Sequence, residues 1–466
     1  MKRYVQVGLW GMLLSGVLAG CAVAEPDKPT AEVKPAAEVK PAAATPAPEV
    51  KAAVKTSVDL LKVQILGETN KSALSYQEGE EMVFTFKADF GGASPEGYFL
   101  AYSRRGDDGV DFSGKAKATE PLVVKTSLGK PGFVSVTVHL MDGKGKIPTV
   151  KIDASRRRQV AFYAGAAVKP ERLKDCGEPA DFDAFWKKQR ARLDAVPFAG
   201  KVTEKLVHRD SNVKVYAVSI PCVGRPATGY LTVPVDAVEK TLPAEVVFFG
   251  YGANRQPMPL SGPKDRIQLR VNAHGQELGR DDAYYKEFFQ SIRSNGYNYA
   301  FDPEQNKDPE TAFFNGMALR AMRALDYLKS RPEWDGKNLR ATGGSQGGLQ
   351  TMWAAALDRS VTEAAPSITW CCDLAGSEKA GRIHGSWRIK YVPALDYYDP
   401  VFMAKRIKNA QVDIRRAGLG DYTCPPSGLA ISYNNLATPR KSIRWVQGSN
   451  HGFVPQKSDV VLWKTY

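Results

Sequence analysis

Hydrophobic and polar positions alternate over much of the region from residue 57 to residue 166. In "MVFTFKA", Met82, Phe84 and Phe86 fall on one face, and "FVSVTVHL" repeats the same two-residue period. This is the period of a half-buried β-strand. Turn-forming stretches such as "GGASPEG" and "RRGDDG" separate the runs. Short strands at this spacing predict an all-β, immunoglobulin-like sandwich over residues 57–166.

The pattern changes at about residue 167, where helical periods begin to alternate with short apolar runs. Residues 313–330 carry an apolar stripe at helical spacing, as does "DFDAFWKKQRARLDAV". The strand candidates between such segments are 213–220, 229–233, 245–249, 297–301, 339–342, 364–369, 411–416 and 443–446. Strands alternating with helices form a largely parallel sheet covered on both faces. We therefore predict an α/β domain over residues 167–466.

The first residues of the chain read as a targeting segment. Lys2 and Arg3 precede a mostly apolar run from Val5 to Leu18, which is too short for a membrane span and is typical of a secretory signal peptide. The run ends in "LAGC", which resembles a bacterial lipobox, so Cys21 is predicted to be the lipidated first residue of the mature chain. The following "AVA" offers an ordinary cleavage site as the alternative.

Residues 22–56 are rich in Pro, Ala, Lys and Glu and contain the tandem repeat "AEVKPA". Such a composition cannot bury a core and predicts an extended, disordered linker. With residues 1–21 as the signal peptide, we expect an exported lipoprotein, in the periplasm or at the cell surface. Its lipid at Cys21 would hold a soluble body on the membrane.

Composition narrows the functional class. The 466 residues are 43% hydrophobic and 24% charged, as in a globular chain of two or three domains. The net charge of +14 is spread along the chain without a nucleic-acid-binding pattern, so no nucleic-acid partner is expected. The five histidines are scattered and no CxxC occurs, so neither a metal nor another cofactor is predicted. Disulfide pairing stays open for an odd number of remaining cysteines: Cys176, Cys222, Cys371, Cys372 and Cys424.

The stretch "GGSQG" at residues 343–347 fits the G-x-S-x-G pattern of a nucleophile elbow. It follows the predicted strand 339–342 and precedes a helix-like segment, which is the context that the elbow requires. Its glycines suit a sharp turn that lets strand and helix pack closely. We predict Ser345 to be a nucleophile; the alternative is a plain glycine-rich turn.

Two later residues complete a triad in the order Ser, acid, His that such folds use. Asp421 follows one predicted strand, and His451 follows the next. His451 would take the proton of Ser345 and Asp421 would orient the imidazole. A surface-loop histidine and a turn aspartate are the alternatives, and Asp373 and Asp399 are runner-up acids.

Several of these segments resemble the acetyl xylan esterase / cephalosporin C deacetylase family of α/β-hydrolases. They are "FDAFWKK", "RPEWDGKNL", "GGSQGGLQ", "GLGDYTCPPSGLAISYNNL" and "HGF", within roughly residues 170–460. The resemblance implies an α/β-hydrolase fold and metal-independent removal of acetyl groups from sugars by Ser345, Asp421 and His451. It implies an acetylated oligo- or polysaccharide as substrate and, because family members often oligomerise, allows a homo-oligomer.

The resemblance also implies an oxyanion hole made of two backbone N–H groups. One belongs to Gln346, and the other to Tyr251 in "FFGYGAN". Phe249 stands where the family usually has His, and Ala253 replaces Gly, so the shape of the pocket near this loop is in question.

Candidate substrate contacts are His274 in "VNAHGQELG" and Trp370 in "SITWCCDLAG", the latter as a sugar platform. A structural loop histidine is the alternative for His274, and ordinary packing is the alternative for Trp370. Two other functions stay open: a related esterase or peptidase with a different acyl substrate, and a glycan-binding surface lipoprotein on an inactivated hydrolase scaffold. The natural glycan is not specified by the sequence.

Overall fold

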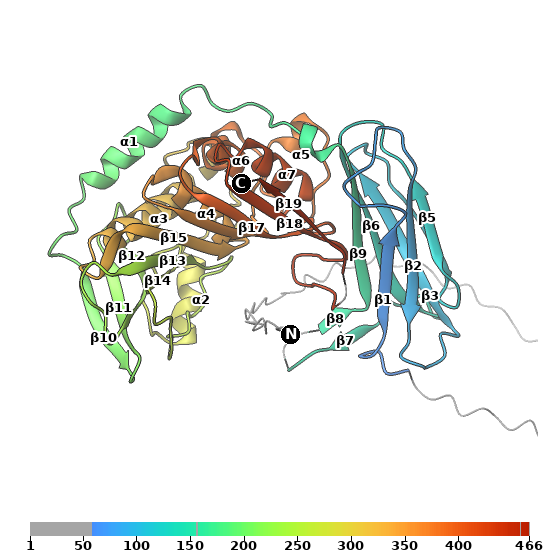
Figure 1. Ribbon diagram of the computed structural model, residues 1–466, viewed down its shortest axis with the longest axis horizontal. Coiled ribbons are helices and arrows are strands. Elements are labelled where there is room, and N and C mark those ends of the chain that lie inside the picture. Colours follow the sequence, from blue (N-terminus) through green and yellow to red (C-terminus); the bar gives the residue numbers. More distant parts are fainter. Residues whose placement is uncertain (1–57, 155–156, 457, 466) are drawn as a thin grey trace, which may run out of the picture.

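The computed structural model of the chain describes residues 58–154, 157–456 and 458–465 (Figure 1). The predicted signal peptide, the linker and Cys21 lie outside the described residues. Among the described residues, no helix is both long enough and apolar enough to cross a membrane.

Residues 58–168, here called the β domain, form antiparallel sheets. The three-stranded sheet has the order β1-β2-β5, the four-stranded sheet has the order β4-β3-β6-β9, and β7 pairs with β8. Met82, Phe84 and Phe86 are all buried, on the face that their two-residue period selects. The strands are β1 (Gln64–Thr69), β2 (Met82–Asp89), β3 (Tyr98–Gly106), β4 (Phe112–Lys117), β5 (Leu122–Thr126), β6 (Gly132–Asp142), β7 (Thr149–Lys151), β8 (Arg157–Gln159) and β9 (Ala161–Val168).

Residues 169–465, here called the α/β domain, contain a ten-stranded mixed sheet. Its order is β10-β11-β12-β14-β13-β15-β16-β17-β18-β19, and the strands from β14 to β18 in this order are parallel to one another. The strands are β10 (Thr203–Arg209), β11 (Val213–Ile220), β12 (Ala227–Pro234), β13 (Leu242–Phe248), β14 (Ile267–Val271), β15 (Trp334–Gly344), β16 (Glu363–Ser367), β17 (Gln411–Gly418), β18 (Lys441–Val446) and β19 (Val460–Thr465).

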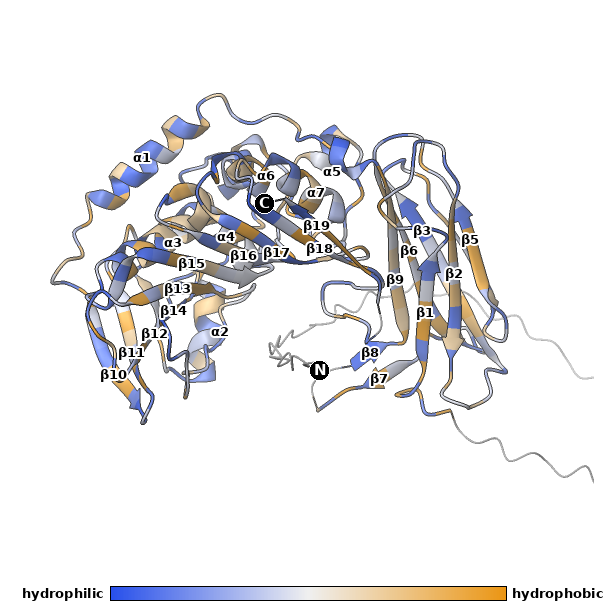
Figure 2. Cartoon of the chain, viewed as in Figure 1, coloured by the Kyte–Doolittle hydropathy of each residue, from blue (hydrophilic) through white to orange (hydrophobic). Residues whose placement is uncertain are grey.

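Helices pack on this sheet as the alternating pattern predicts. The apolar stripe of residues 313–330 becomes α3, which packs beside α4. The helices are α1 (Phe182–Asp194), α2 (Asp282–Ser291), α3 (Phe313–Lys329), α4 (Gln346–Leu357), α5 (Gly376–Lys379), α6 (Pro400–Met403) and α7 (Pro426–Asn435). Figure 2 shows apolar residues along the sheet strands and a mixture of polar and apolar residues on α1.

One strand prediction is wrong. Residues 297–301 form a loop, in which Ala300 has a positive φ of 69° and Tyr299 is fully buried. The ring of Tyr299 in this run packs on those of Tyr251 and Phe313. The pattern missed three strands of the sheet, which are β10, β14 and β19; in β14 only Ile267, Leu269 and Val271 mark the buried face.

The two domains meet along β9, which lies beside the end of β18 (Figure 1). The side-chain amide of Gln447 pairs with the backbone of Gly165: it accepts from the Gly165 N–H at 2.9 Å and donates to the Gly165 carbonyl at 2.8 Å. A Cβ atom at position 165 would lie 2.3 Å from the Leu419 carbonyl oxygen. The β domain therefore contacts the loops that follow β17 and β18 directly.

Candidate active site

Ser345 occupies a strained turn between β15 and α4. Its backbone has φ 58° and ψ −118°, a region that side-chain-bearing residues rarely adopt. The Ser345 N–H donates to the Ser367 carbonyl at 2.9 Å, and its carbonyl accepts from the Trp370 N–H at 3.1 Å. Such strain persists where the surroundings impose it, and it is concentrated at functional sites.

The glycines on both sides of the serine are required by close backbone contacts. A Cβ atom on Gly343 would lie 2.5 Å from the backbone of Gly347, and one on Gly347 would lie 2.3 Å from the Phe248 carbonyl oxygen. Helix α4 therefore starts directly against β13 and β15. This geometry is the one that G-x-S-x-G predicts for a nucleophile elbow.

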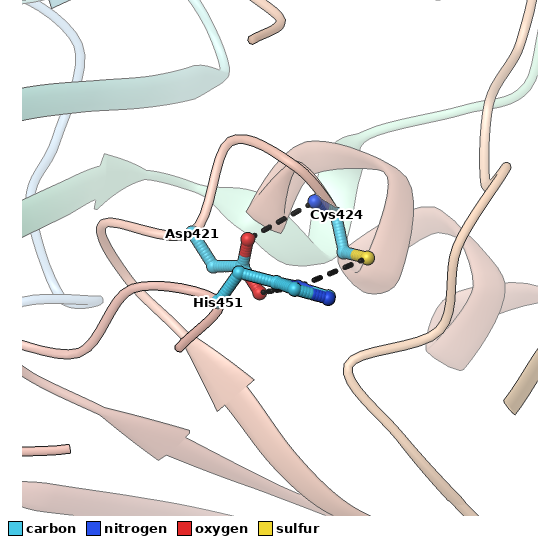
Figure 3. Close-up of side chains that lie close together, drawn as sticks. All are labelled: Asp421, Cys424 and His451. Atoms are coloured by element: carbon cyan, nitrogen blue, oxygen red, sulfur yellow. Dashed lines mark hydrogen bonds and ion pairs between the residues drawn. The ribbon is translucent and has the colours of Figure 1, made fainter. Parts of the chain in front are cut away.

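Asp421 and His451 contact each other beyond the ends of β17 and β18 (Figure 3). The His451 Nδ1 lies 3.0 Å from the Asp421 Oδ2. Asp421 is fully buried, and its other carboxylate oxygen accepts from the N–H groups of Thr423 at 3.0 Å and Cys424 at 3.1 Å. With the carboxylate fixed in this way, Nδ1–H donates to Asp421 and leaves Nε2 to exchange a proton.

Ser345 lies at the same edge of the sheet as this pair. Strands β15, β16, β17 and β18 are consecutive parallel neighbours, so their carboxyl ends face the same way. Within the described residues, Ser345 and His451 are not hydrogen-bonded to each other. Catalytic hydrogen bonds are often long without substrate and shorten in the complex. The structure thus joins Asp421 to His451 and presents Ser345 from the neighbouring elbow.

Cys424 also lies beside this pair, which the sequence analysis did not anticipate. Its Sγ is 3.7 Å from the His451 Nδ1, and the ligand atoms of Asp421, Cys424 and His451 lie within 4.8 Å of one another (Figure 3). Burial, and then the charge of Asp421, raise the pKa of the Cys424 thiol well above its usual value. A neutral thiol and a carboxylate already bonded to the imidazole suit an acid–base pair better than a metal centre. None of the described cysteines forms a disulfide.

Tyr299 links the two segments that carry the amides predicted for the oxyanion hole. The Tyr299 hydroxyl accepts from the Gly252 N–H at 2.8 Å and donates to the Gln346 Oε1 at 2.7 Å. Its ring stacks on that of Tyr251, with 4.3 Å between the centroids. In the described part of the chain, the N–H groups of Tyr251 and Gln346 have no acceptor. Tyr299, which sequence reasoning missed, therefore ties the loop after β13 to the elbow.

The two candidate substrate contacts are both buried. His274 is 1% exposed and packs against Tyr299 and Phe313. Burial, and then the nearby Arg320, lower the pKa of His274 to about 3, so this imidazole is neutral. Trp370 is 3% exposed, and its indole N–H donates to the Trp387 carbonyl at 3.3 Å. These positions favour a structural role for His274 and packing for Trp370, and substrate contact stays a prediction for both.

The runner-up acids Asp373 and Asp399 form their side-chain hydrogen bonds within residues 373–401. The Asp399 carboxylate accepts from the N–H groups of Asp373 at 3.0 Å and Leu374 at 2.7 Å. Asp373 pairs with Arg382 at 2.5 Å, and burial raises the pKa of Asp373 to about 6. Among the described residues, neither carboxylate is hydrogen-bonded to His451, so Asp421 is the better candidate.

Comparisons with known proteins identify the family of this chain. The family model described as acetyl xylan esterase (AXE1) matches residues 171–380 and 387–465. Acetyl esterase Axe7A from Xylanibacter ruminicola is 27% identical over 329 residues, which cover 68% of this chain and 70% of that protein.

Solved structures with a similar chain include two acetyl xylan esterases. The enzyme from Paenibacillus sp. R4 is 24% identical with a TM-score of 0.49, covering 62% of this chain and 94% of that one. Acetyl xylan esterase 1 from Thermoanaerobacterium sp. JW/SL YS485 is 21% identical with a TM-score of 0.49 and the same coverage.

Proposed function

We propose that this chain, which belongs to the acetyl xylan esterase family, removes O-acetyl groups from sugars by a serine mechanism. Membership of the family makes it a carboxylic ester hydrolase. The proposal assigns the nucleophile to Ser345, the base to His451 and the orienting acid to Asp421, on an α/β-hydrolase fold. The observation that carries it is the 3.0 Å contact between Asp421 and His451 at the sheet edge where the strained Ser345 turn lies.

The reaction follows from these positions. The Ser345 hydroxyl attacks the acetyl carbonyl while the His451 Nε2 takes its proton. The N–H groups of Tyr251 and Gln346 would donate to the oxyanion of the tetrahedral intermediate, where each such donor contributes about 3 kcal/mol. His451 then protonates the sugar oxygen, which leaves. Water, deprotonated by His451, hydrolyses the acetyl-Ser345 ester and releases acetate.

The two alternative functions are less well supported. A glycan-binding protein without activity has no need for a serine at positive φ or for a buried carboxylate bonded to an imidazole. The similar protein from Xylanibacter ruminicola is described as an acetyl esterase, which supports an acetyl group over another acyl group. These observations favour acetyl ester hydrolysis.

Hydrolysis of a small chromogenic acetate ester tests this mechanism. We expect Ser345→Ala to lower kcat by about a thousandfold or more, because no nucleophile remains. Ser291→Ala, which removes an exposed hydroxyl at the end of α2, is the matched control and should retain full activity. Equal rates for wild type and Ser345→Ala would remove Ser345 from the mechanism.

We further propose that the protein is exported and tethered by lipid at Cys21, with an immunoglobulin-like β domain between tether and esterase. The basic, apolar and "LAGC" segments of the sequence support export, and the two antiparallel sheets support the sandwich. In cells, Cys21→Ser should move the protein from the membrane fraction to the soluble fraction. Unchanged membrane association would contradict lipidation at this residue.

A further inference from the structure

A pocket opens beside the acid of the candidate triad. Its cavity volume is about 50 Å³, and it is lined by residues between 370 and 389 and by residues of the loop that carries Asp421. Tyr422 and Thr423, the two residues after Asp421, are in its wall, as is Trp370, whose N–H is bonded to the Ser345 carbonyl. The wall of the pocket therefore includes the two residues that follow Asp421 and one residue bonded to the backbone of Ser345.

One wall of this pocket is a segment that the family model does not match. The match stops at residue 380 and resumes at 387, and the unmatched residues include Ile383, His384 and Gly385 of the lining. The Gly385 N–H donates to the Tyr422 carbonyl at 2.7 Å. A Cβ atom at position 385 would lie 2.4 Å from that oxygen. The segment 381–386 therefore lies directly on the acid loop.

The β domain holds this segment from the other side. The buried carboxylate of Asp107 accepts from the Ile383 N–H at 2.9 Å and from the Phe133 N–H of β6 at 2.8 Å. Arg105, on β3, donates to the His384 carbonyl at 3.4 Å. Both partners lie about 280 residues earlier in the chain. The shape of the pocket thus depends on the β domain.

Trp387 follows the segment directly and is the exposed aromatic side chain of this pocket. It is 44% exposed, although its ring contacts Tyr251 at 5.0 Å and Phe301 at 5.9 Å. Its carbonyl is held by the indole N–H of Trp370. A tryptophan that is fixed on an aromatic base and still open to solvent offers a flat apolar surface at low entropic cost. The apolar C–H face of a sugar ring is complementary to such a surface.

We infer that Trp387 is a sugar-stacking residue of a substrate subsite, and that the β domain positions this subsite through Asp107. This inference rests on the proposed function, because it assumes a carbohydrate substrate. It adds that the enzyme prefers acetylated oligo- or polysaccharides to isolated acetyl esters. The ring stacked on Trp387 neighbours the sugar whose acetyl group enters the oxyanion hole beside Tyr251.

Two substrates, acetylated xylo-oligosaccharide and a small chromogenic acetate ester, separate this role from catalysis. For Trp387→Ala we expect kcat/KM on the oligosaccharide to fall about tenfold or more, mainly through KM. On the small ester the loss should be clearly smaller, because that substrate does not reach the subsite. Trp387→Phe, which keeps a ring, should recover most of the loss. Phe112→Ala, an exposed aromatic on β4, is the control and should leave the preference unchanged.

Variants of the β domain test the second half of the inference. Asp107→Ala should show the same preference change, together with faster proteolysis at residues 381–386. Because that variant also leaves buried N–H groups unpaired, Arg105→Ala provides a milder second variant with the same direction of change.

The outcomes are distinct. Equal loss on both substrates, or no loss on the oligosaccharide, overturns the role of Trp387. An unchanged preference in both β-domain variants overturns positioning by that domain. If wild type hydrolyses the small ester but not the oligosaccharide, the carbohydrate function fails, and this inference fails with it.

Discussion

The candidate nucleophile Ser345 and the Asp421–His451 pair lie at one edge of one sheet, but different parts of the molecule hold them. The Ser345 turn is fixed inside the α/β domain, by Ser367 on β16 and by the Phe248 carbonyl against Gly347. The loops that carry Asp421 and His451 also contact the β domain. Leu419 lies against Gly165, and Gln447 is bonded to it on both sides.

This difference assigns a role to the β domain. The family model matches from residue 171 onward, so β9 lies outside the matched region. Nevertheless β9 supplies the surface on which both acid–base loops pack, and Tyr163 on β9 donates its N–H to the Gly448 carbonyl at 3.4 Å. A domain that packs on the loops of Asp421 and His451 helps to shape the candidate active site.

We expect the largest loss of activity from a change at Asp421, which contacts His451. Asp421→Asn keeps an oxygen for the N–H groups of Thr423 and Cys424 but favours the wrong tautomer of His451. We expect kcat on a small acetate ester to fall about 10³- to 10⁴-fold, as in other serine triads. Asp413→Asn, whose partner is Ser442 on β18, is the control and should retain activity. A loss smaller than tenfold would show that another residue orients His451.

A smaller effect should follow from breaking the domain contact behind His451. Gln447→Ala removes both hydrogen bonds to Gly165 and leaves two buried backbone groups without partners, at about 1–3 kcal/mol each. We expect a lower Tm and a kcat reduced about tenfold at temperatures where the variant remains folded, because the His451 loop loses its support.

The control for this experiment is Gln268→Ala on β14. It loses the bond from Gln268 to Glu245 at 2.7 Å, far along the chain from the acid–base loops. We expect it to lower Tm without changing kcat. If Gln447→Ala behaves in the same way, the β domain contributes stability alone, and the contrast between the two halves of the site disappears.

The same contrast explains what the sequence could predict. The elbow leaves a local signature, because the close contacts of Gly343 and Gly347 exclude any side chain there. Asp421 and His451 could be proposed from their places after successive strands. Neither the bond between them nor the support from Gly165 has a local signature, because both depend on segments far apart in the chain.

Other features depended on tertiary context in the same way. Tyr299 lies in an apolar run that reads as a strand, whereas its hydroxyl links two loops of the site. The sequence could not tell Trp387 from Trp370, of which the first is 44% and the second 3% exposed, because exposure depends on tertiary packing. In both cases the role of the residue depends on contacts between distant segments, which the hydrophobic periodicity of the sequence does not encode.

The pairing of Gly165 with Gln447 spans 282 residues. The ribosome makes β9 well before the His451 loop, so the surface on which this loop packs exists before the loop itself. During synthesis, the chain would therefore contain the Ser345 turn before the loop of His451 has formed its contacts with β9. On this order of events, the ability to cleave esters arrives late in synthesis, after most of the described polypeptide has left the ribosome tunnel.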